Sequence, residues 1–432
     1  MKVLIIGNGG REHALAWKAA QSPQVEHVFV APGNAGTDLE EKVSNAAIAV
    51  DDFDALIALV KSEDIALTIV GPEVPLVKGI VDRFEKEQLP VFGPGQQAAQ
   101  LEGSKSFTKD FLARHAIPTA EYQTFTRVED ALKYLEQLDE KGKAVPIVIK
   151  ADGLAAGKGV IVAMTKQEAQ DAIHDMLEAN AFGDAGARVV IEEYLEGEEA
   201  SFIVMSDGVN VLPMATSQDH KRALNGDKGP NTGGMGAYSP APVVTADVEA
   251  RIMKEVIEPT IKGMREEGAP FVGFLYAGLM IDTSGAPKVI EYNVRFGDPE
   301  TQPIMLRLKS DLVTLCQAAL EGKLDTVTCE WHSQPAVGVV LVSGGYPGAY
   351  RKGDPITGID DAEQAGAKVF QAGTALKDGH IVSDGGRVLC VTALGESVAE
   401  AAQVAYQALD HVSLPDGEYR TDIGHRAINR VQ

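Results

Sequence analysis

At its most informative point the sequence reads Ile290-Glu291-Tyr292-Asn293-Val294-Arg295-Phe296. Because side chains alternate between the two faces of a β-strand, Glu291, Asn293 and Arg295 fall on one face and the apolar residues on the other. A carboxylate and an amide oxygen suit Mg²⁺, which takes one or two protein groups together with phosphate oxygens. The arginine can hold a carboxylate or a phosphate as a bidentate fork. The alternative, an ordinary solvent-facing Glu–Arg pair, is disfavoured by the polar turn that follows, Gly297-Asp298-Pro299-Glu300-Thr301.

A glycine-rich loop lies upstream, between the apolar strands expected at Pro146–Lys150 and Val160–Ala163. It is not a P-loop, because Lys158 is followed by Gly159 instead of Ser or Thr and a strand, not a helix, comes next. A strand–loop–strand of this composition predicts a lid whose amides cover a triphosphate, with Lys150 as the charged anchor. The alternative is a solvated hairpin, which seldom needs three glycines.

The first 120 residues or so alternate short apolar runs with helical segments such as Glu12–Ala20. The apolar runs each end in a glycine-containing turn and are Val3–Ile6, Val28–Ala31, Leu67–Val70 and Val91-Phe92. This alternation predicts an open, doubly wound parallel α/β sheet. Ligands of such sheets bind at the carboxyl ends of the strands, where these turns lie.

The first of these turns, Gly7-Asn8-Gly9-Gly10, lets backbone N–H groups approach a phosphate closely. A nicotinamide dinucleotide site is disfavoured, because Glu12 stands where the third glycine of that motif belongs and no acid ends the second strand. Two interpretations stay open: a phosphate site for another ligand, with Arg11 as its charged partner, or a turn that needs glycine for packing alone.

The remainder of the chain predicts a different architecture. Strand alternation indicates an antiparallel sheet, and residues 217–240 read as a long polar loop of the kind usually kept for function. The expected elements are the strands Arg188–Glu193, Phe202–Met205 and Val211–Met214, helices at Lys166–Ala179 and 246–267, and a hairpin of Tyr276–Asp282 with Lys288–Arg295. After residue 331 we expect hairpins at Ala336–Ser343 and Ile381–Thr392 and a helix at 396–409.

Composition and charge exclude several classes of protein. The chain has 432 residues and a net charge of −23, which argues against nucleic-acid binding and against a cationic membrane surface. Three scattered cysteines, Cys316, Cys329 and Cys390, exclude a disulfide framework and a cysteine-rich zinc site. The apolar run Met1–Gly7 is too short for a signal peptide or a membrane span. We therefore expect a cytoplasmic protein.

Taken together, these residues resemble the ATP-grasp carboxylate–amine ligases. The glycine loop, Lys150, the strap Glu192-Glu193-Tyr194-Leu195 with Glu199, and Glu291-x-Asn293-x-Arg295 occur in that family's order. The stretches Gly7–His13, Pro230–Gly236 and Arg295–Gln302 narrow the resemblance to a member that joins glycine to 5-phosphoribosylamine. The resemblance implies formation of glycinamide ribonucleotide, ADP and phosphate through glycyl phosphate, the second step of purine synthesis.

The resemblance also implies a fold of four parts. We expect a doubly wound α/β domain over residues 1–122, an ATP-grasp lid over 123–192, a central antiparallel domain over 193–330 and a small α+β domain over 331–432. The implied small molecules are ATP, Mg²⁺ or Mn²⁺, glycine and 5-phosphoribosylamine. The expected assembly is a monomer or a weak dimer, with neither nucleic acid nor membrane as a partner.

Family roles carry over onto positions of this chain. They place the ATP phosphates at Lys105, Lys150, Gly153, Gly157, Lys158 and Gly159, adenine at Glu192, Glu193, Tyr194 and Leu195, the ATP ribose at Glu199, and the metal at Glu291 and Asn293. Catalysis is assigned to Arg295, Lys150 and Asp219. The glycine and amine sites are assigned to Arg295, Asp219, Asn231, Thr232, Gly233 and Gly234, and the ribosylamine to Gly9, Gly10, Arg11, Asn34, Gly71, Pro72 and Glu73.

One departure and several competing functions remain. Many ATP-grasp relatives carry a second metal-binding carboxylate where this chain has Tyr276-Ala277-Gly278-Leu279, which leaves Asp298 as a candidate contributor. His220 reads better as a residue that shapes its loop than as a catalytic base, and His13 as a structural residue.

The alternative functions for the chain are a biotin-dependent carboxylase subunit or another purine-pathway ligase, an NAD dehydrogenase, and a catalytically silent nucleotide-binding protein.

Overall fold

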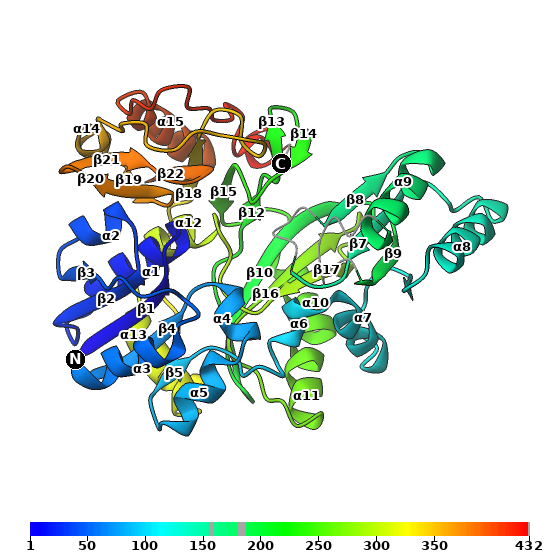
Figure 1. Ribbon diagram of the computed structural model, residues 1–432, viewed down its shortest axis with the longest axis horizontal. Coiled ribbons are helices and arrows are strands. Elements are labelled where there is room, and N and C mark those ends of the chain that lie inside the picture. The colour runs from blue at the N-terminus through cyan, green and yellow to red at the C-terminus, as the bar shows by residue number, and fades with distance from the viewer. Residues whose placement is uncertain (155–158, 179–186, 431–432) are drawn as a thin grey trace.

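The computed structural model describes residues 1–154, 159–178 and 187–430. Figure 1 shows the first sheet and the last sheet stacked at one end of the molecule, the long antiparallel sheet in the middle, and a small sheet with α8 and α9 projecting at the far end. The fold is therefore mixed α/β, with the predicted parallel sheet first and antiparallel sheets after it.

The N-terminal sheet confirms the predicted doubly wound topology. Its five strands are all parallel, in the order β3-β2-β1-β4-β5. They are β1 (Lys2–Gly7), β2 (His27–Pro32), β3 (Val43–Asn45), β4 (Ile65–Val70) and β5 (Val91–Phe92), joined by α1 (Gly10–Ala20), α2 (Ala35–Leu39), α3 (Phe53–Ser62), α4 (Glu73–Val77) and α5 (Ile80–Lys86). The turns at the carboxyl ends of β1 and β4 lie side by side, because Gly71 donates its N–H to the carbonyl of Ile6 at 2.9 Å.

The projecting part is a four-stranded antiparallel sheet in the order β6-β9-β7-β8. Two helices supply the apolar side chains that pack on it. Its elements are β6 (Tyr122–Phe125), α8 (Val128–Glu140), β7 (Ile147–Ala151), β8 (Val160–Ala163), α9 (Lys166–Leu177) and β9 (Val189–Glu193), preceded by α6 (Gln100–Gly103) and α7 (Lys105–Arg114). The strands predicted on both sides of the glycine loop are thus confirmed as the paired neighbours β7 and β8.

The central sheet is antiparallel, in the order β11-β10-β16-β17. Its elements are β10 (Glu198–Asp207), β11 (Val211–Pro213), β16 (Val272–Ile281) and β17 (Pro287–Asn293), covered by α10 (Ala246–Ile252), the π-helical turn η2 (Met253–Ile257) and α11 (Glu258–Glu266). The register of β17 against β16 shifts between Gly278 and Leu279, which leaves Ile290 as an extra residue in the strand. The predicted hairpin of β16 and β17 is confirmed.

The last sheet mixes strands from distant parts of the chain, in the order β12-β15-β18-β22-β19. The elements of this region are β12 (Gln218–Asp219), β13 (Arg222–Leu224), β14 (Lys228–Asn231), β15 (Gly236–Ser239), α12 (Thr301–Arg307), α13 (Leu312–Leu320), η3 (Leu324–Thr326), β18 (Ala336–Val342), α14 (Ile359–Gln364), β19 (Lys368–Gln371), β20 (Thr374–Lys377), β21 (His380–Ser383), β22 (Arg387–Leu394), α15 (Val398–Leu409) and α16 (His425–Ile428). Because β12 and β15 precede residue 330, this sheet crosses the boundary expected there.

Three local expectations were wrong. The segment Ala336–Ser343 is not a hairpin, because Ala336–Val342 forms the single strand β18. The segment Ile381–Thr392 is not a hairpin, because β21 pairs with β20 while β22 pairs with β18 and β19. The segment 217–240 is not an unstructured loop, since it holds the four short strands β12 to β15. The turn Asp384-Gly385-Gly386 does separate two strands, but each pairs with another partner; within 217–240 the pairing is local, β13 with β14 and β12 with β15.

The N-terminal and C-terminal sheets share one core. A single cluster of buried apolar side chains runs from Val3 and Val28 in the first sheet to Val339 and Val391 in the last. Polar contacts reinforce this interface. The Nδ1 of His13 accepts the N–H of Gln371 at 2.8 Å, and its Nε2 lies 3.0 Å from Glu40, which also pairs with Lys368. His13 thus has the structural role expected for it.

Candidate active site

The predicted alternation holds from Glu291 to Asn293, but Ile290 is an extra, half-buried residue of β17, and Val294 to Phe296 lie beyond the end of the strand. Tyr292, Val294 and Phe296 are buried, with 2, 0 and 1% of their surface exposed. On the opposite face the Oδ1 of Asn293 accepts a hydrogen bond from Arg295 at 3.1 Å. Glu291 lies on that face too: although burial alone would raise the pKa of its carboxyl, the surrounding cations, led by Lys221, lower it to about 2. The Glu291 carboxylate is therefore ionised and faces a strongly positive surrounding.

These groups fit a divalent cation that binds together with a phosphate. Glu291 and Asn293 supply one carboxylate and one amide oxygen from a single strand face, which are hard oxygen ligands of the kind Mg²⁺ takes. Within the described ranges, no group of three or more His, Cys, Asp or Glu side chains could hold a metal by itself. This donor set therefore suits a metal that completes its coordination with substrate oxygens and water.

Two lysines from the projecting sheet and its linker approach this face. The Nζ of Lys150 donates to the carbonyl of Ile290, the extra residue of β17, at 3.0 Å. Lys105, at the start of α7, donates to the carbonyl of Gly153 at 2.8 Å. The glycine loop is held at its base by Asp152, which accepts from Ser106 at 2.8 Å. Positive charge thus gathers between the loop and the strand.

The glycine loop is described only at its two ends. Gly153 adopts a φ of +91°, which favours glycine, and the carbonyl of Gly159 accepts the N–H of Ala151 at 2.8 Å. The predicted phosphate contacts of Gly157 and Lys158 lie outside the described residues.

Glu192 in the strap carries a buried ion cluster. Its carboxylate lies 3.0 Å from the Nζ of Lys150 and 3.2 Å from the Nζ of Lys109, and all three side chains are at most 5% exposed. Burial lowers the pKa of Lys109 to about 8, although Glu192 opposes that change. The Glu192 side chain is thus engaged by two lysines, and its contact with adenine stays a prediction.

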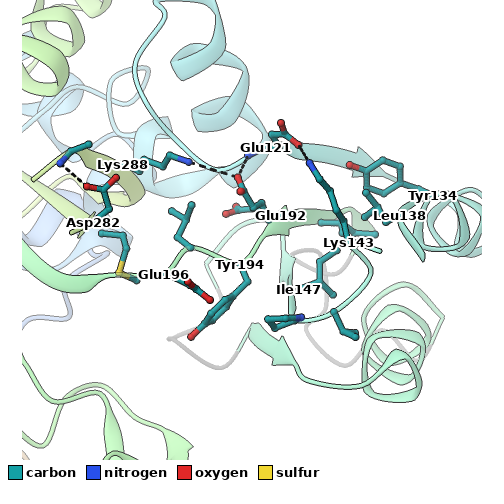
Figure 2. Close-up of a pocket in the computed structure, with 17 residues that line it drawn as sticks. Glu121, Tyr134, Leu138, Lys143, Ile147, Glu192, Tyr194, Glu196, Asp282 and Lys288 are labelled. Atoms are coloured by element: carbon teal, nitrogen blue, oxygen red, sulfur yellow. Dashed lines mark hydrogen bonds and ion pairs between the residues drawn. The ribbon is translucent and has the colours of Figure 1, made fainter. Parts of the chain in front are cut away.

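A cavity of about 390 Å³ borders the strap. Figure 2 shows Lys288 and Asp282 at one end, Tyr134 and Leu138 of α8 at the other, and the strap between them. The lining also includes Glu193, Tyr194 and Leu195. A cavity of this volume with an apolar wall is in the range of small-molecule sites, and it brings the predicted adenine-binding residues together.

A second ion cluster surrounds Lys221. Its ammonium pairs with Glu199 and lies 3.5 Å from Glu291. Burial would lower the pKa of Lys221, but Glu199, Glu291 and Asp219 raise it well above its ordinary value, so the ammonium stays charged. Burial raises the pKa of the Asp219 carboxyl. The charge of Lys221 acts against this rise, and the charge of Glu300 adds to it. The structure thus brings Glu199, Asp219 and Glu291 together around one lysine.

The loop 231–234 is positioned by hydrogen bonds to its backbone. The N–H and hydroxyl of Thr232 both donate to the carbonyl of Lys221, at 2.7 and 2.9 Å. Arg387, from the last sheet, donates to the carbonyls of Gly233 and Asp298, each at 2.8 Å. Gly234 has a φ of +123°, and a Cβ there would lie 2.4 Å from the ring of Pro299. Asn231 ends β14 in the same segment. The loop therefore packs against the turn that follows Arg295.

Arg295 is held by two glutamates, one on helix α4 and one on helix α6. Its guanidinium lies 2.7 Å from Glu102, at the end of α6, and 3.3 Å from Glu73, after the Gly71-Pro72 turn. Burial raises the pKa of the Glu102 carboxyl to about 7, against the effect of Arg295. Both Glu102 oxygens nevertheless accept N–H donors, which is the geometry of the ionised form. The predicted Arg295 and Glu73 are thus neighbours.

The first glycine turn is filled by Glu12. Its carboxylate accepts the N–H of Gly9 at 2.7 Å, and a Cβ on Gly71 would lie 2.1 Å from it. This side chain takes the space that a dinucleotide would need, which disfavours the dehydrogenase alternative. Arg11 pairs with Glu12 and donates to the carbonyl of Phe296 at 3.2 Å. Gly10 begins α1.

Asn34 is engaged within the protein. Its Oδ1 caps α2, and its Nδ2 donates to the carbonyls of Asn8 and Gln371 at 2.9 and 2.8 Å. The structure therefore gives Asn34 a role in joining the first and last sheets, while its contact with a ribosylamine stays a prediction.

The sequence interpretation missed Lys109, Lys221, Glu102 and Arg387. Two of them carry a local signal. Lys109 follows Lys105 by one helical turn in α7, so the two share a face. Lys221 follows Asp219 by two residues, just beyond the end of β12. Glu102 and Arg387 reach the site only through contacts across 193 and 154 residues, which local spacing does not reveal.

His220 is buried and its Nε2 accepts the N–H of Gly424 at 3.0 Å, in keeping with a shaping role.

Comparisons with known proteins give the family. Models of the phosphoribosylglycinamide synthetase N domain, ATP-grasp (A) domain and C domain match residues 1–102, 103–301 and 336–426. The chain is 67% identical to the phosphoribosylamine–glycine ligase of Escherichia coli K12 and 65% identical to that of Vibrio cholerae, with all of each chain covered. The crystal structure of phosphoribosylamine–glycine ligase from Thermotoga maritima superposes with a TM-score of 0.84 at 34% identity, covering 98% of this chain and 100% of that one. With the three family models covering most of its length, the chain belongs to the phosphoribosylglycinamide synthetase family.

Proposed function

We propose that this protein joins glycine to 5-phosphoribosylamine at the expense of ATP, giving glycinamide ribonucleotide, ADP and phosphate. The observation that carries the proposal is the cluster at the end of β17, where Arg295 donates to Asn293 and where Lys150 and Lys105 help to lower the pKa of the Glu291 carboxyl. The full-length identity with phosphoribosylamine–glycine ligases supports the choice of substrates. A carboxylate resists attack by an amine, whereas the phosphate of an acyl phosphate leaves readily, so the sequence of steps begins with phosphorylation of glycine.

Transfer of the γ-phosphoryl group needs in-line positioning and charge neutralisation more than acid–base chemistry. Lys105 and Lys150 bind the ATP phosphates, and the strap with its adjoining cavity holds adenine. Glu291 and Asn293 hold Mg²⁺ or Mn²⁺, which supplies neutralisation of the phosphate charge when bound. Replacement of Glu291 by Ala should lower the Mg²⁺-dependent affinity for ADP at least tenfold in calorimetry, with ADP binding in EDTA unchanged. Equal Mg²⁺ dependence in the variant and the wild type would contradict the metal role.

Arg295 binds the glycine carboxylate and then the acyl phosphate, because its guanidinium can fork onto two oxygens. Asp219 and the loop 231–234 border the amine. The ribosylamine phosphate and hydroxyls bind at the turns of the N-terminal sheet, beside Gly9, Gly71 and Glu73. The 3.3 Å distance between the Glu73 carboxylate and Arg295 supports a sugar site next to the activated glycine.

A coupled assay of ADP formation tests the function. ADP should appear only with glycine present, and omission of 5-phosphoribosylamine should abolish the amide product. Arg295→Ala should lose glycine-dependent ADP formation. Stimulation by bicarbonate instead of glycine would favour a carboxylase, and ATP binding without turnover would favour a silent nucleotide-binding protein.

The four-part division at residues 122, 192 and 330 remains part of this proposal, as do a monomeric or weakly dimeric state and a cytoplasmic location. In the described ranges no helix has the length and apolarity that a membrane span requires.

A further inference from the structure

Glu102 occupies an unusual position beside the predicted glycine-binding arginine. It lies at the end of α6, and its side chain is 8% exposed. Its Oε1 accepts from a terminal nitrogen of Arg295 at 2.7 Å, and its Oε2 accepts the backbone N–H of Val294 at 2.8 Å. One carboxylate thus fixes both the guanidinium and the main chain between Asn293 and Arg295.

Glu73 contacts the same guanidinium differently. Its Oε2 lies 3.3 Å from the Nε of Arg295, yet within the described part of the chain this buried Nε makes no hydrogen bond. The same terminal nitrogen that Glu102 holds also donates to Asn293 at 3.1 Å. Glu102 and Asn293 therefore hold one terminal nitrogen of the guanidinium, the other terminal nitrogen donates to the carbonyl of Phe296 at 3.2 Å, and the Nε faces the Glu73 carboxylate.

We propose that Glu102 is the positioning residue that orients Arg295 toward the glycine carboxylate. The inference rests on the proposed function, since it takes Arg295 as the group that binds the glycine carboxylate. Because α6 follows the N-terminal sheet, Glu102 also couples the part of the molecule assigned to the ribosylamine with the strand assigned to the metal and glycine.

Glu102→Gln is the sharpest perturbation. The amide keeps the size of the side chain but offers a single acceptor oxygen, whereas Arg295 and Val294 both present N–H donors. Either orientation of the amide therefore sets its NH₂ against a donor. We expect the KM for glycine to rise roughly tenfold or more, the cost of one charge-assisted hydrogen bond, while the KM for ATP stays within about twofold.

The matched control is Glu63→Gln, which removes the same charge from an exposed glutamate that pairs with Lys2. It should leave all kinetic constants unchanged. A double-mutant cycle with Arg295→Ala separates positioning from a general structural role. In the Arg295→Ala background, Glu102→Gln should have no further effect on glycine dependence, measured as glycine binding by calorimetry.

Three outcomes overturn the inference: an unchanged glycine KM in Glu102→Gln, equal rises in the KM of glycine and ATP, or fully additive effects in the cycle. If Glu102→Gln does not fold, Glu102→Asp carries the same test, because it keeps the charge but is one methylene too short to reach both donors. Failure of the proposed function is seen separately, as wild-type ADP formation that does not depend on glycine.

Discussion

The interface between the first and last sheets offers a test in which the magnitude can be worked out. Burial would raise the pKa of the Glu40 carboxyl, but its hydrogen bonds to His13 and Lys368 lower it from 4.5 to about 2. The Glu40 side chain is only 17% exposed, so solvent screens these contacts little. Since His13 accepts the N–H of Gln371 on Nδ1, its proton is on Nε2 and points to Glu40.

A carboxyl whose pKa is lower in the folded state stabilises that state above its unfolded pKa. At about 1.36 kcal/mol per pKa unit, the change from 4.5 to about 2 is worth about 3 kcal/mol near pH 7. The contribution is lost as the pH falls from about 4.5 toward 2, and about 2 kcal/mol remains at pH 3.5. Glu40→Gln should therefore lower the free energy of unfolding by about 3 kcal/mol at pH 7 and by less in acid.

Urea unfolding followed by tryptophan fluorescence measures this difference. Trp17 packs edge-to-face on Phe370 across the interface, with ring centroids 5.4 Å apart, and Trp331 packs on the same shared core. The control is again Glu63→Gln, whose exposed pair with Lys2 should contribute about 1 kcal/mol or less. Equal unfolding midpoints for the two variants, or a Glu40→Gln effect that does not shrink between pH 7 and 3.5, would refute the reasoning.

Two further predictions concern the interior of the site. Glu192→Ala leaves two buried ammonium groups without their carboxylate and should destabilise the protein by about 3–5 kcal/mol, whereas Lys109→Met keeps the Lys150 pair and should change stability by about 1 kcal/mol or less in urea unfolding. Gly234→Ala should lower glycine-dependent activity, because its Cβ would lie 2.4 Å from a proline ring. The control Gly142→Ala also replaces a glycine at positive φ, but the space around it is open, so it should reduce only stability. Differential scanning calorimetry measures the stability of both variants.

Local geometry is what the sequence could predict. The burial of Tyr292, Val294 and Phe296 follows the two-residue period of an extended chain, which continues past the end of β17 at Asn293. The same holds for β1 and β4 with their glycine turns, and for β7 and β8 around the glycine loop. The order of motifs then gave the family and, with it, the predicted roles of Glu291 and Arg295.

Contacts between strands or side chains that lie far apart in the sequence could not be predicted in this way. The turn Asp384-Gly385-Gly386 looks like a hairpin, yet β21 and β22 join different sheets because each has another partner to pair with. The sequence shows Glu192 in the strap, but not that Lys109 and Lys150 would occupy its carboxylate. Likewise, the sequence shows that Glu12 replaces the third glycine of the dinucleotide motif, but not that its side chain fills the turn.

The bond from Gln371 to His13 joins residues 358 positions apart. During synthesis the N-terminal sheet leaves the ribosome long before β19 is made. Until then, its apolar side chains in the common core and the side chain of Asn34 have no partner from the last sheet. The apolar surface that later meets the last sheet is exposed to other chains throughout that interval. Expression at lower temperature or with a holdase chaperone should therefore raise the yield of native protein more than faster translation does.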